Sequence, residues 1–356
     1  MTEFAPGVLR QAIDPPSRSL PVVIFGAGSI VSDAHLPAYR QAGFAVAGIY
    51  DPDFAKAKAL AEAWNTSVFS SVEQAVANSQ VVFDLAVPPE AIPGILEQLP
   101  EGVTALIQKP LGSDLSAASR IVDICEARGL RAAVNFQLRF APMILALKDA
   151  IARGWLGEVV DFDAWLALDT PWHLWEFLAG LPRVEILLHS IHYLDTIREL
   201  LGDPKGVHAK TLGHPSSKIA QTRTSAILDF GDQVRCSLSI NHNHSFGRKF
   251  QACEFRIGGT EGGAYVKLGV NLDYPKGEPD ELWIYPKGGS EWVKVPLIGS
   301  WFIDAFVGRM TQVQRYAVGD DTELQGAVAD AWKTMALVEA AYESSAAPAT
   351  PLAVRT

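Results

Sequence analysis

Two patterns of hydrophobic and polar positions follow one another along the chain. Between Pro21 and about Phe140, short apolar runs rich in β-branched residues alternate with helical stretches, as in "PVVIFGAG", "FAVAGIYD" and "DFAKAKALAEAW". The short runs are continuously apolar, which is typical of strands covered on both faces. Strands and helices alternating in this order predict an α/β architecture, a parallel sheet with helices on both sides.

The pattern changes after Phe140, where one helical stretch leads to the strand-like run "EVVDFDAWLAL". From Gly206 to Val295, further strand-like runs are separated by segments rich in Gly, Pro, Asp and Lys, and they predict a large, open, mostly antiparallel sheet. The runs are "GVHAKTLG", "TSAILDFG", "VRCSLSINH", "KFQACEFRIG", "GAYVKLGV", "ELWIYP" and "EWVKVP". Two helices, around residues 301–316 and 322–343, end the chain, so this half is predicted to be α+β.

We therefore expect two domains, which is also what the length of 356 residues suggests. The first domain covers residues 1–140, and its first twenty residues could form an arm. The second covers residues 141–356, and its last helices are expected to pack back on the first domain.

Composition excludes several classes of protein. The net charge is −10 and Lys and Arg form no cluster, so we expect no nucleic-acid partner. No apolar stretch reaches the roughly 20 residues that span a bilayer, so we expect no membrane association. The three cysteines, Cys125, Cys236 and Cys253, form no C-x-x-C pair, and the N-terminus resembles no secretory signal. These features favour a cytoplasmic location.

A glycine-rich turn follows the first predicted strand, in "VVIFGAGSIVSDAHLPAY". Gly26 permits a sharp turn and Gly28 lets a pyrophosphate approach the backbone, although Val31 stands where a third glycine is usual. Asp51 ends the second strand, where an acid accepts hydrogen bonds from ribose hydroxyls and repels the 2′-phosphate of NADP. We predict a Rossmann domain that binds NAD, with NADP less favoured. The expected contacts are Gly26, Ala27, Gly28, Ser29, Ile30 and Asp51.

The alternative is a strand–helix turn without a ligand, in which Asp51 is an N-cap.

Two other strand ends face the same edge of the sheet. "LAVPPEA" places Val87, Pro88 and Pro89 there, either as a wall of the cofactor crevice or as a simple strand terminator. "ALIQKPLGSDL" places Lys109 at the end of the fifth strand, where an ammonium can hold a cofactor or a substrate oxygen. In isolation, a solvated lysine in a loop would be the simpler interpretation.

The stretch "EILLHSIHYLDTIREL", which starts at Glu185, has the spacing of a helix with one buried stripe. His189 and His192 lie in the middle of it, and Glu185 is placed to orient either imidazole. These three side chains share one side of the helix and His173 is nearby in sequence, which raises the alternative of a metal site.

The order of these motifs resembles the Gfo/Idh/MocA family of NAD(P)-dependent oxidoreductases, from Pro21 to the final helix. The elements that carry the resemblance are the glycine-rich turn, Asp51, the Lys-Pro pair at Lys109, "NFQLRFAPMILALKDAIARGWLGEVV" and the helix with His before "YLD". It implies that Lys109 and His192 are catalytic, with His192 as acid/base. It also implies that the enzyme needs no metal, so we expect none.

The sequence departs from the family pattern at three positions. Gln108 stands where the family has Glu, Leu188 where it has Asp, and Ser190 where it has Gly. The family Asp helps to hold the substrate, so its role is open here. His189 is expected either to contact the substrate or to make a structural hydrogen bond. It cannot simply take the place of the family Asp, because it is adjacent to Leu188 and adjacent residues point about 100° apart on a helix.

Aromatic and polar residues suggest where a sugar would bind. The loop "DTPWHLWEF" offers Trp172 and His173, although Trp172 could instead seal the domain interface. In "SINHNHSFGRKF" only alternate residues can face one pocket, and we select the set containing Asn241. Arg139 closes the first domain, where it either contacts the substrate or pairs with an acid at the hinge.

Together these features suggest an NAD-dependent dehydrogenase that oxidises a small sugar, a pentose such as apiose or arabinose, at the anomeric carbon to a lactone. The alternatives are an inositol or hexose dehydrogenase, a redox-neutral NAD-using glycosidase or dehydratase, and a sensor that only binds the dinucleotide. The open face of the second sheet, with Trp283 and Trp292 in its strands, predicts a homodimer or homotetramer.

Overall fold

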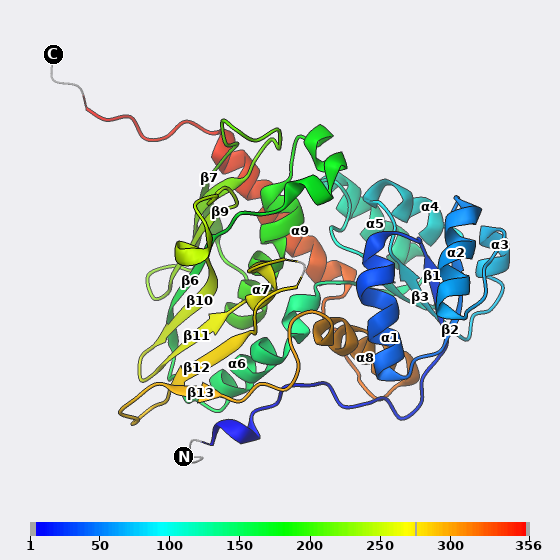
Figure 1. Cartoon of the computed structure of the whole chain (residues 1–356), viewed down its shortest axis with the longest axis horizontal. Coiled ribbons are helices and arrows are strands. Elements are labelled where there is room, and N and C mark those ends of the chain that lie inside the picture. Colours follow the sequence, from blue (N-terminus) through cyan, green and yellow to red (C-terminus); the bar gives the residue numbers. More distant parts are fainter. Residues whose placement is uncertain (1–4, 275, 354–356) are drawn as a thin grey trace.

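The computed structural model describes residues 5–274 and 276–353, and it places two sheets on opposite sides of the molecule (Figure 1). The first sheet has five strands and the second has eight. The predicted α/β class, with one parallel and one mostly antiparallel sheet, is confirmed.

The first sheet is parallel and has the strand order β2-β1-β3-β4-β5. Its strand order reverses between β1 and β3, which is where open parallel sheets bind their ligands. Every residue of β1, β3 and β4 is buried, because helices cover both faces. The elements are β1 (Val22–Phe25), α1 (Leu36–Ala42), β2 (Val46–Tyr50), α2 (Phe54–Trp64), α3 (Val72–Ala75), β3 (Val82–Leu85), α4 (Ile92–Leu96), β4 (Thr104–Ile107), α5 (Leu115–Ala127) and β5 (Arg131–Val134).

The second sheet has the strand order β13-β12-β11-β10-β6-β9-β8-β7. Neighbouring strands are antiparallel except for β6 and β9, which run parallel at the centre, so the sheet is mixed. One face of each strand is buried and the other is more exposed, as the alternation in the sequence requires. The strands are β6 (Val159–Ala167), β7 (Gly206–Leu212), β8 (Arg223–Asp229), β9 (Arg235–Asn241), β10 (Ala252–Gly259), β11 (Gly263–Lys267), β12 (Glu281–Tyr285) and β13 (Val293–Val295).

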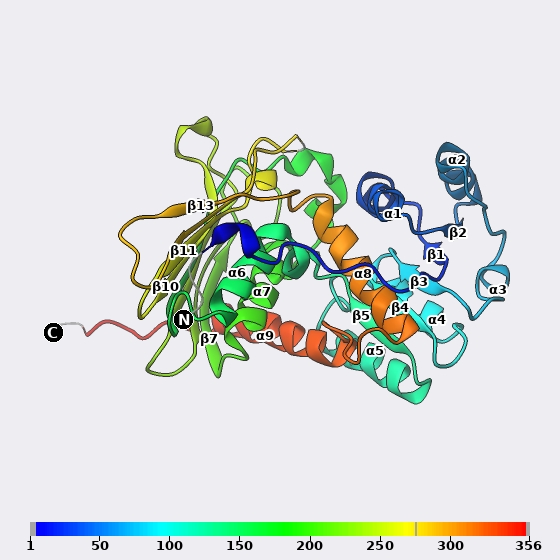
Figure 2. The same cartoon turned by 90° about the horizontal axis from the view of Figure 1, so that it is seen from below.

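A layer of helices lies between the large sheet and the first domain, as Figure 2 shows. It consists of α6 (Pro142–Ala152), α7 (Ile191–Leu201) and α9 (Val328–Ala346). The remaining helix, α8 (Asp304–Val318), packs on the first sheet, where its apolar side chains join the core around α1 and β1. Helix α9 contacts both α5 and β7, so the end of the chain holds the two sheets together.

The segment that precedes β1 runs along the surface of both halves (Figure 2). The backbone N–H of Arg10 donates to Asp149 of α6 at 3.0 Å, and Leu9 is buried. Nearer to β1, the N–H of Leu20 donates to Gln314 of α8 at 2.8 Å. This segment is therefore a strap held by both halves rather than a free arm.

The face of the large sheet that turns away from the helices carries charged and aromatic side chains. Arg256 lies over the ring of Trp165 at 5.8 Å, and Lys294 lies over the ring of Trp283 at 5.4 Å. Trp292, expected in a strand, comes just before β13. The outward positions are therefore ion-paired and stacked rather than uniformly apolar, as we had expected for this face.

The three cysteines are free and buried. Burial raises the pKa of each thiol to about 12, so none is a reactive thiolate near neutral pH. Over the described ranges of the chain, no helix combines the length and the apolar character that crossing a bilayer requires.

Candidate active site

The turn between β1 and α1 has the geometry that its glycines predict. Gly26 has φ +106°, and a Cβ there would lie 2.2 Å from the carbonyl oxygen of Ala86, so only glycine fits. A Cβ on Gly28 would meet no described atom within 4 Å, which leaves open space at this point. Helical backbone begins at Ser29. In the described structure the amides of Ser29 and Ile30 have no hydrogen-bond acceptor, as is usual for a helix N-terminus.

Asp51 ties the end of β2 to this turn. Its carboxylate accepts hydrogen bonds from the N–H of Ala27 at 2.8 Å and from the N–H of Asp53 at 2.9 Å. Asp53, rather than Asp51, is the N-cap of α2, since its side chain accepts from the N–H of Lys56. The carboxylate of Asp51 retains lone pairs that could accept ribose hydroxyls.

The segment after β3 forms the opposite side of the turn. A side-chain methyl of Val87 lies 3.5 Å from the position that a Cβ of Gly26 would take. Pro88 and Pro89 follow and lead into a short 3₁₀ turn. The open space, the free helical amides and the acid at the end of β2 together fit the pyrophosphate and the ribose of a dinucleotide.

Lys109 reaches from the first domain to the second. It follows β4, the fourth strand of the chain, and the expectation of the fifth strand was wrong. Its Nζ donates to the carbonyl oxygen of Leu188 at 2.9 Å. The side-chain oxygen of Gln108, which replaces the family Glu, accepts from the N–H of Lys109 at 2.9 Å. Burial of the ammonium lowers the pKa of Lys109 to about 8.

The helix predicted from Glu185 begins as a π-helical turn, Glu185–Ser190, and continues as α7. His192 lies in the first turn of α7 and is 7% exposed, with its ring 6.4 Å from those of Phe136 and Trp301. Burial and then the charge of Lys109 lower the pKa of His192 well below its ordinary value, so the imidazole is neutral at pH 7. Its Nδ1 is buried and has no hydrogen-bond partner within the described ranges.

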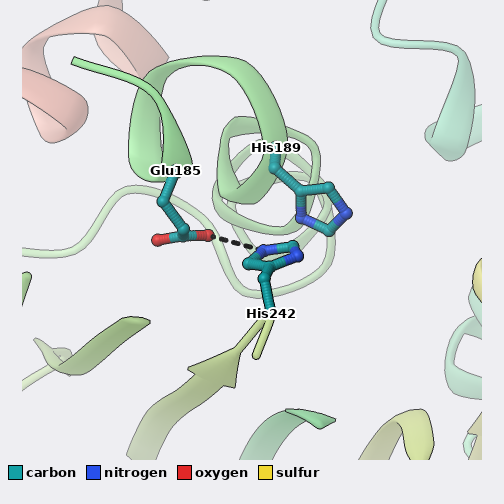
Figure 3. A group of neighbouring side chains, drawn as sticks. All are labelled: Glu185, His189 and His242. Carbon is teal, nitrogen blue, oxygen red and sulfur yellow. Dashed lines mark ion pairs between the residues drawn. The ribbon is translucent and has the colours of Figure 1, made fainter. Parts of the chain in front are cut away.

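His189 faces a second imidazole, that of His242, which was not among the expected site residues (Figure 3). The two rings lie 4.3 Å apart, edge to face, and Nε2 of His242 is 3.6 Å from Oε1 of Glu185. The Glu185 carboxylate accepts hydrogen bonds from the hydroxyls of Ser190 and Thr224. It therefore orients neither imidazole of its own helix through a hydrogen bond, contrary to expectation.

Strand alternation explains why His242 faces the helix and Asn241 does not. Asn241 is the last residue of β9, and Ile240 and His242 on either side of it are both buried. The side chain of Asn241 therefore lies on the other face of the sheet, where it accepts from the N–H of Asn243 at 3.0 Å. The selection of Asn241 for the substrate pocket was wrong. The buried apolar residues Cys236, Leu238 and Ile240 of β9 have the same parity as His242, so the sequence already indicated that His242 lies on the buried face.

The aromatic loop brings Trp172 to this group but leaves His173 outside it. The ring of Trp172 lies 5.1 Å from that of His242, and its Nε1 is buried without a hydrogen-bond partner among the described residues. His173 is exposed. Of the residues that the structure describes, the one group able to hold a metal is Glu185, His189 and His242, so neither His173 nor His192 belongs to it.

Arg139 pairs with acids at the hinge, the second of the two alternatives for this residue. Its guanidinium contacts Asp195 through Nε and Nη2 at 2.5 and 2.6 Å, and it also contacts Glu199 and Asp330. Burial opposes its charge, but the three carboxylates raise the pKa of Arg139 above its ordinary value. The guanidinium joins the 3₁₀ turn Gln137–Phe140, which follows β5, to α7 and α9, and we place it outside the substrate pocket as a correction.

Two family models match the chain. One, described as "Oxidoreductase family, NAD-binding Rossmann fold", matches residues 20–136, and the other, described as "GFO/IDH/MocA C-terminal domain", matches residues 144–265. Together they cover about two thirds of the chain, in the order of its two sheets. The chain therefore belongs to the Gfo/Idh/MocA family of NAD(P)-dependent oxidoreductases.

Individual relatives are distant. The putative oxidoreductase YceM of Salmonella typhimurium is 30% identical over 132 residues, which are 37% of this chain and less than half, 43%, of that protein. A D-apiose dehydrogenase of Paraburkholderia graminis is 24% identical over 322 residues, 87% of this chain and 84% of that protein. Among solved structures, an oxidoreductase from Agrobacterium radiobacter in complex with NAD⁺, L-tartaric acid and magnesium has a TM-score of 0.78 at 23% identity, and the match covers 92% of this chain and 97% of that one. The structural likeness shows the fold alone.

Proposed function

We propose that the protein is an NAD-dependent dehydrogenase that oxidises a small sugar, a pentose such as apiose or arabinose, at its anomeric carbon to a lactone. One observation carries the proposal. The ammonium of Lys109, from the first domain, lies 2.9 Å from the carbonyl oxygen of Leu188, four residues before His192 on the site helix. A cation and a neutral base brought together beside a dinucleotide-binding turn are the groups that oxidation of a carbinol needs.

In this proposal His192 accepts the proton of the substrate hydroxyl, because its imidazole is held neutral in a buried site. Lys109 donates a hydrogen bond to the same oxygen and stabilises the negative charge that develops there. Bound NAD⁺ would supply the hydride acceptor. The carbinol loses one proton and one hydride, and the product is the lactone.

We favour NAD over NADP because of the acid at the end of β2. A carboxylate at Asp51 accepts ribose hydroxyls but repels a 2′-phosphate. Of the two lysines on α2 that could offset this repulsion, Lys58 lies 3.8 Å from Glu62 in an exposed ion pair. Its charge is therefore partly engaged within the helix.

The choice of a pentose has two supports. A relative named D-apiose dehydrogenase is similar over 87% of this chain. The proposed pocket would also combine the ring of Trp172 with buried polar atoms that lack partners in the described structure, Nε1 of Trp172 itself and Nδ1 of His192. Apolar faces with a few unsatisfied hydrogen-bonding groups are what a sugar pocket requires.

A substrate screen tests the reaction. Pentoses, hexoses and inositols are incubated with NAD⁺ or NADP⁺, and both reduced dinucleotide and sugar product are measured. We expect NADH and lactone in equal amounts with apiose or arabinose. Product without net NADH would replace the proposal by redox-neutral chemistry, and faster turnover of inositol or a hexose would overturn the choice of substrate.

Two variants test the assigned residues. Lys109→Met and His192→Asn should each lower kcat/KM by about 10²–10⁴-fold, the usual loss when an acid/base or charge-stabilising group is removed. The exposed residues Lys218 and His208 provide matched controls, Lys218→Met and His208→Asn, which should keep wild-type rates. Normal rates in both site variants would leave only a dinucleotide-binding sensor.

We also propose that the outward face of the large sheet forms a homodimer or homotetramer. Trp165 is 39% exposed and Ile227 is 56% exposed on this face, which supports a contact there. Static light scattering at micromolar concentration should give a multiple of the chain mass. A monomer would remove this proposal without affecting the reaction.

A further inference from the structure

Three groups that commonly bind transition metals converge beside the candidate active site. Glu185 and His189 come from the π-helical turn, and His242 comes from the end of β9 (Figure 3). One ligand atom from each residue lies within 4.8 Å of the other two. Glu185 and His242 are fully buried or nearly so, with 0% and 1% of their surface exposed.

Hydroxyl groups hold two of these side chains in place from behind. The hydroxyl of Thr170 lies 2.7 Å from Nδ1 of His242, which turns Nε2 of that ring toward Glu185 and His189. Ser190 and Thr224 donate to the two carboxylate oxygens of Glu185. Such hydrogen bonds to the outer side of the ligands are the usual surroundings of a protein metal site, where they fix the orientation of each ligand.

Two nitrogens in this group are buried and lack a hydrogen-bond partner among the described residues: Nε2 of His242 and Nδ1 of His189. Nε2 of His242 is 3.6 Å from the Glu185 carboxylate, too long for a hydrogen bond. A buried polar atom without a partner loses its hydrogen bonds to water, and these two lie on neighbouring rings beside a buried carboxylate. Figure 3 shows Nε2 of His242 directed at the Glu185 carboxylate and the ring of His189 beside that of His242.

We propose that Glu185, His189 and His242 bind one divalent transition-metal ion, with zinc as the best match. Two imidazoles and one carboxylate with a remaining open position form a common catalytic zinc ligand set. Magnesium and calcium prefer oxygen ligands, so they match this set poorly. An ion here replaces the missing hydrogen bonds of both nitrogens and neutralises the buried carboxylate.

The distances agree with this assignment after a small closure. Ligand atoms around a tetrahedral zinc ion lie about 3.4 Å apart, as its bonds of about 2.0–2.2 Å require. Glu185 and His242 are already at 3.6 Å, and all three ligand atoms lie within 4.8 Å of one another. The closure required of His189 is therefore at most about 1.4 Å, which side-chain rotation can supply.

The position of the site gives the ion a role in the reaction, and in that respect the proposal rests on the proposed function. His189 precedes the proposed base His192 by one helical turn, and the ring of Trp172 covers His242. The open position of the ion then offers a ligand site to a substrate oxygen, in place of the family Asp that is missing at Leu188. Metal binding itself requires no assumption about the reaction.

Metal titration of the full-length protein tests the site. The purified protein is treated with a chelator, dialysed and titrated with CoCl₂ and ZnCl₂ in the absence of dinucleotide and sugar. We expect one equivalent of either ion, with visible d–d absorption for cobalt that zinc displaces. No binding by folded wild-type protein in excess metal would overturn the proposal.

Variants show which residues hold the ion. Glu185→Gln, His189→Asn and His242→Asn should each abolish stoichiometric binding, whereas the control His208→Asn, on an exposed position of β7, should bind normally. Unchanged binding in the three site variants would also overturn the proposal. Circular dichroism establishes that each variant is folded.

Thr170→Val keeps all three ligands and removes only the hydroxyl behind His242. It should therefore fold and bind cobalt about 10–100-fold more weakly, the usual effect of removing such a group. Wild-type affinity in this variant would contradict the assigned geometry. Because binding is measured without substrate, a protein that binds the ion but oxidises no sugar would refute the proposed function and leave the metal site intact.

Discussion

Two buried pairs of an imidazole and a carboxylate, one in each half of the molecule, differ in what surrounds the imidazole. In the first domain, Nδ1 of His35 is 2.7 Å from Asp84 and Nε2 is 3.3 Å from the side-chain amide of Asn135. Both nitrogens are therefore occupied, and the hydroxyl of Tyr39 donates to the same oxygen of Asp84 at 2.6 Å. Burial and the nearby carboxylate raise the pKa of Tyr39 well above its ordinary value.

In the second half, only one nitrogen of His242 has a partner among the residues that the structure describes, the hydroxyl of Thr170. Its other nitrogen is open, and so is Nδ1 of the neighbouring His189. Both pairs adjoin a π-helical turn, Val31–His35 in one case and Glu185–Ser190 in the other. The π turn alone therefore does not mark a binding site. An imidazole whose two nitrogens both have hydrogen-bond partners indicates a structural role. A buried imidazole nitrogen without a partner indicates a place for a ligand.

The largest expected effect concerns the pair of His35 and Asp84, in which both imidazole nitrogens have partners. Asp84→Ala leaves the ring of His35 and the hydroxyl of Tyr39 without their shared acceptor in the core of the first domain. Removing one partner of a buried pair of this kind costs about 3–5 kcal/mol of unfolding free energy. Urea denaturation followed by circular dichroism measures this loss. The exposed acid Asp123 on α5 provides the control, and Asp123→Ala should change stability by less than about 0.5 kcal/mol.

A loss below about 1 kcal/mol in Asp84→Ala would erase the distinction between the two pairs. It would mean that the imidazole of His35 is satisfied without its carboxylate. The partners of its imidazole would then no longer distinguish His242 from His35.

The pair of His242 and Glu185 should respond to a ligand instead. At a zinc concentration of 100 times its Kd, the wild-type protein should gain about 2.7 kcal/mol of unfolding free energy, because the ion binds the folded state alone. The variant His242→Asn should gain nothing from zinc, and the stability that it loses without metal should reflect only the packing of the buried ring against His189 and Trp172, since Nε2 makes no hydrogen bond within the described ranges. Denaturant unfolding with and without ZnCl₂ measures both effects. Equal stabilisation of both proteins would show that zinc binds elsewhere.

Much of the fold follows from local patterns in the sequence. The continuous apolar runs predicted the five parallel strands, and the alternating runs predicted β7 to β13. The parallel pairing of β6 with β9 was not predictable in this way, because it depends on which distant strands meet in the sheet. The same limit applies to the π-helical turn at Glu185, since the spacing of its apolar residues also fits an α-helix.

The candidate site was predicted in part. Lys109 lies between an apolar strand-like run and a proline in "ALIQKPLGSDL", so its place at a strand end could be inferred from the sequence. His242 was missed although the sequence held the signal, because it shares the parity of the buried apolar residues Cys236, Leu238 and Ile240 of β9. Arg139 could not be assigned either, since its partners Asp195 and Asp330 lie far along the chain.

The smallest expected effect is the pH dependence that Lys109 confers. Its pKa is lowered from 10.5 to about 8 in the folded protein, so between these values the unfolded chain binds more protons than the folded one. The unfolding free energy should therefore rise as the pH increases from about 8 to about 10.5, and remain unaffected by this group below that range. Each pKa unit is worth 1.36 kcal/mol, and partial exposure reduces the sum to about 1–2 kcal/mol.

Activity should change in the opposite direction over the same range. The proposed reaction needs Lys109 as a cation, so kcat/KM should be level around neutral pH, where the lowered pKa of His192 keeps the imidazole neutral, and fall as the pH passes about 8. Lys109→Met should remove both the gain in stability and the fall in the residual rate. A wild-type rate that keeps rising above this pH would mean that the neutral amine, acting as a base, is the working form. The roles of Lys109 and His192 would then have to be exchanged.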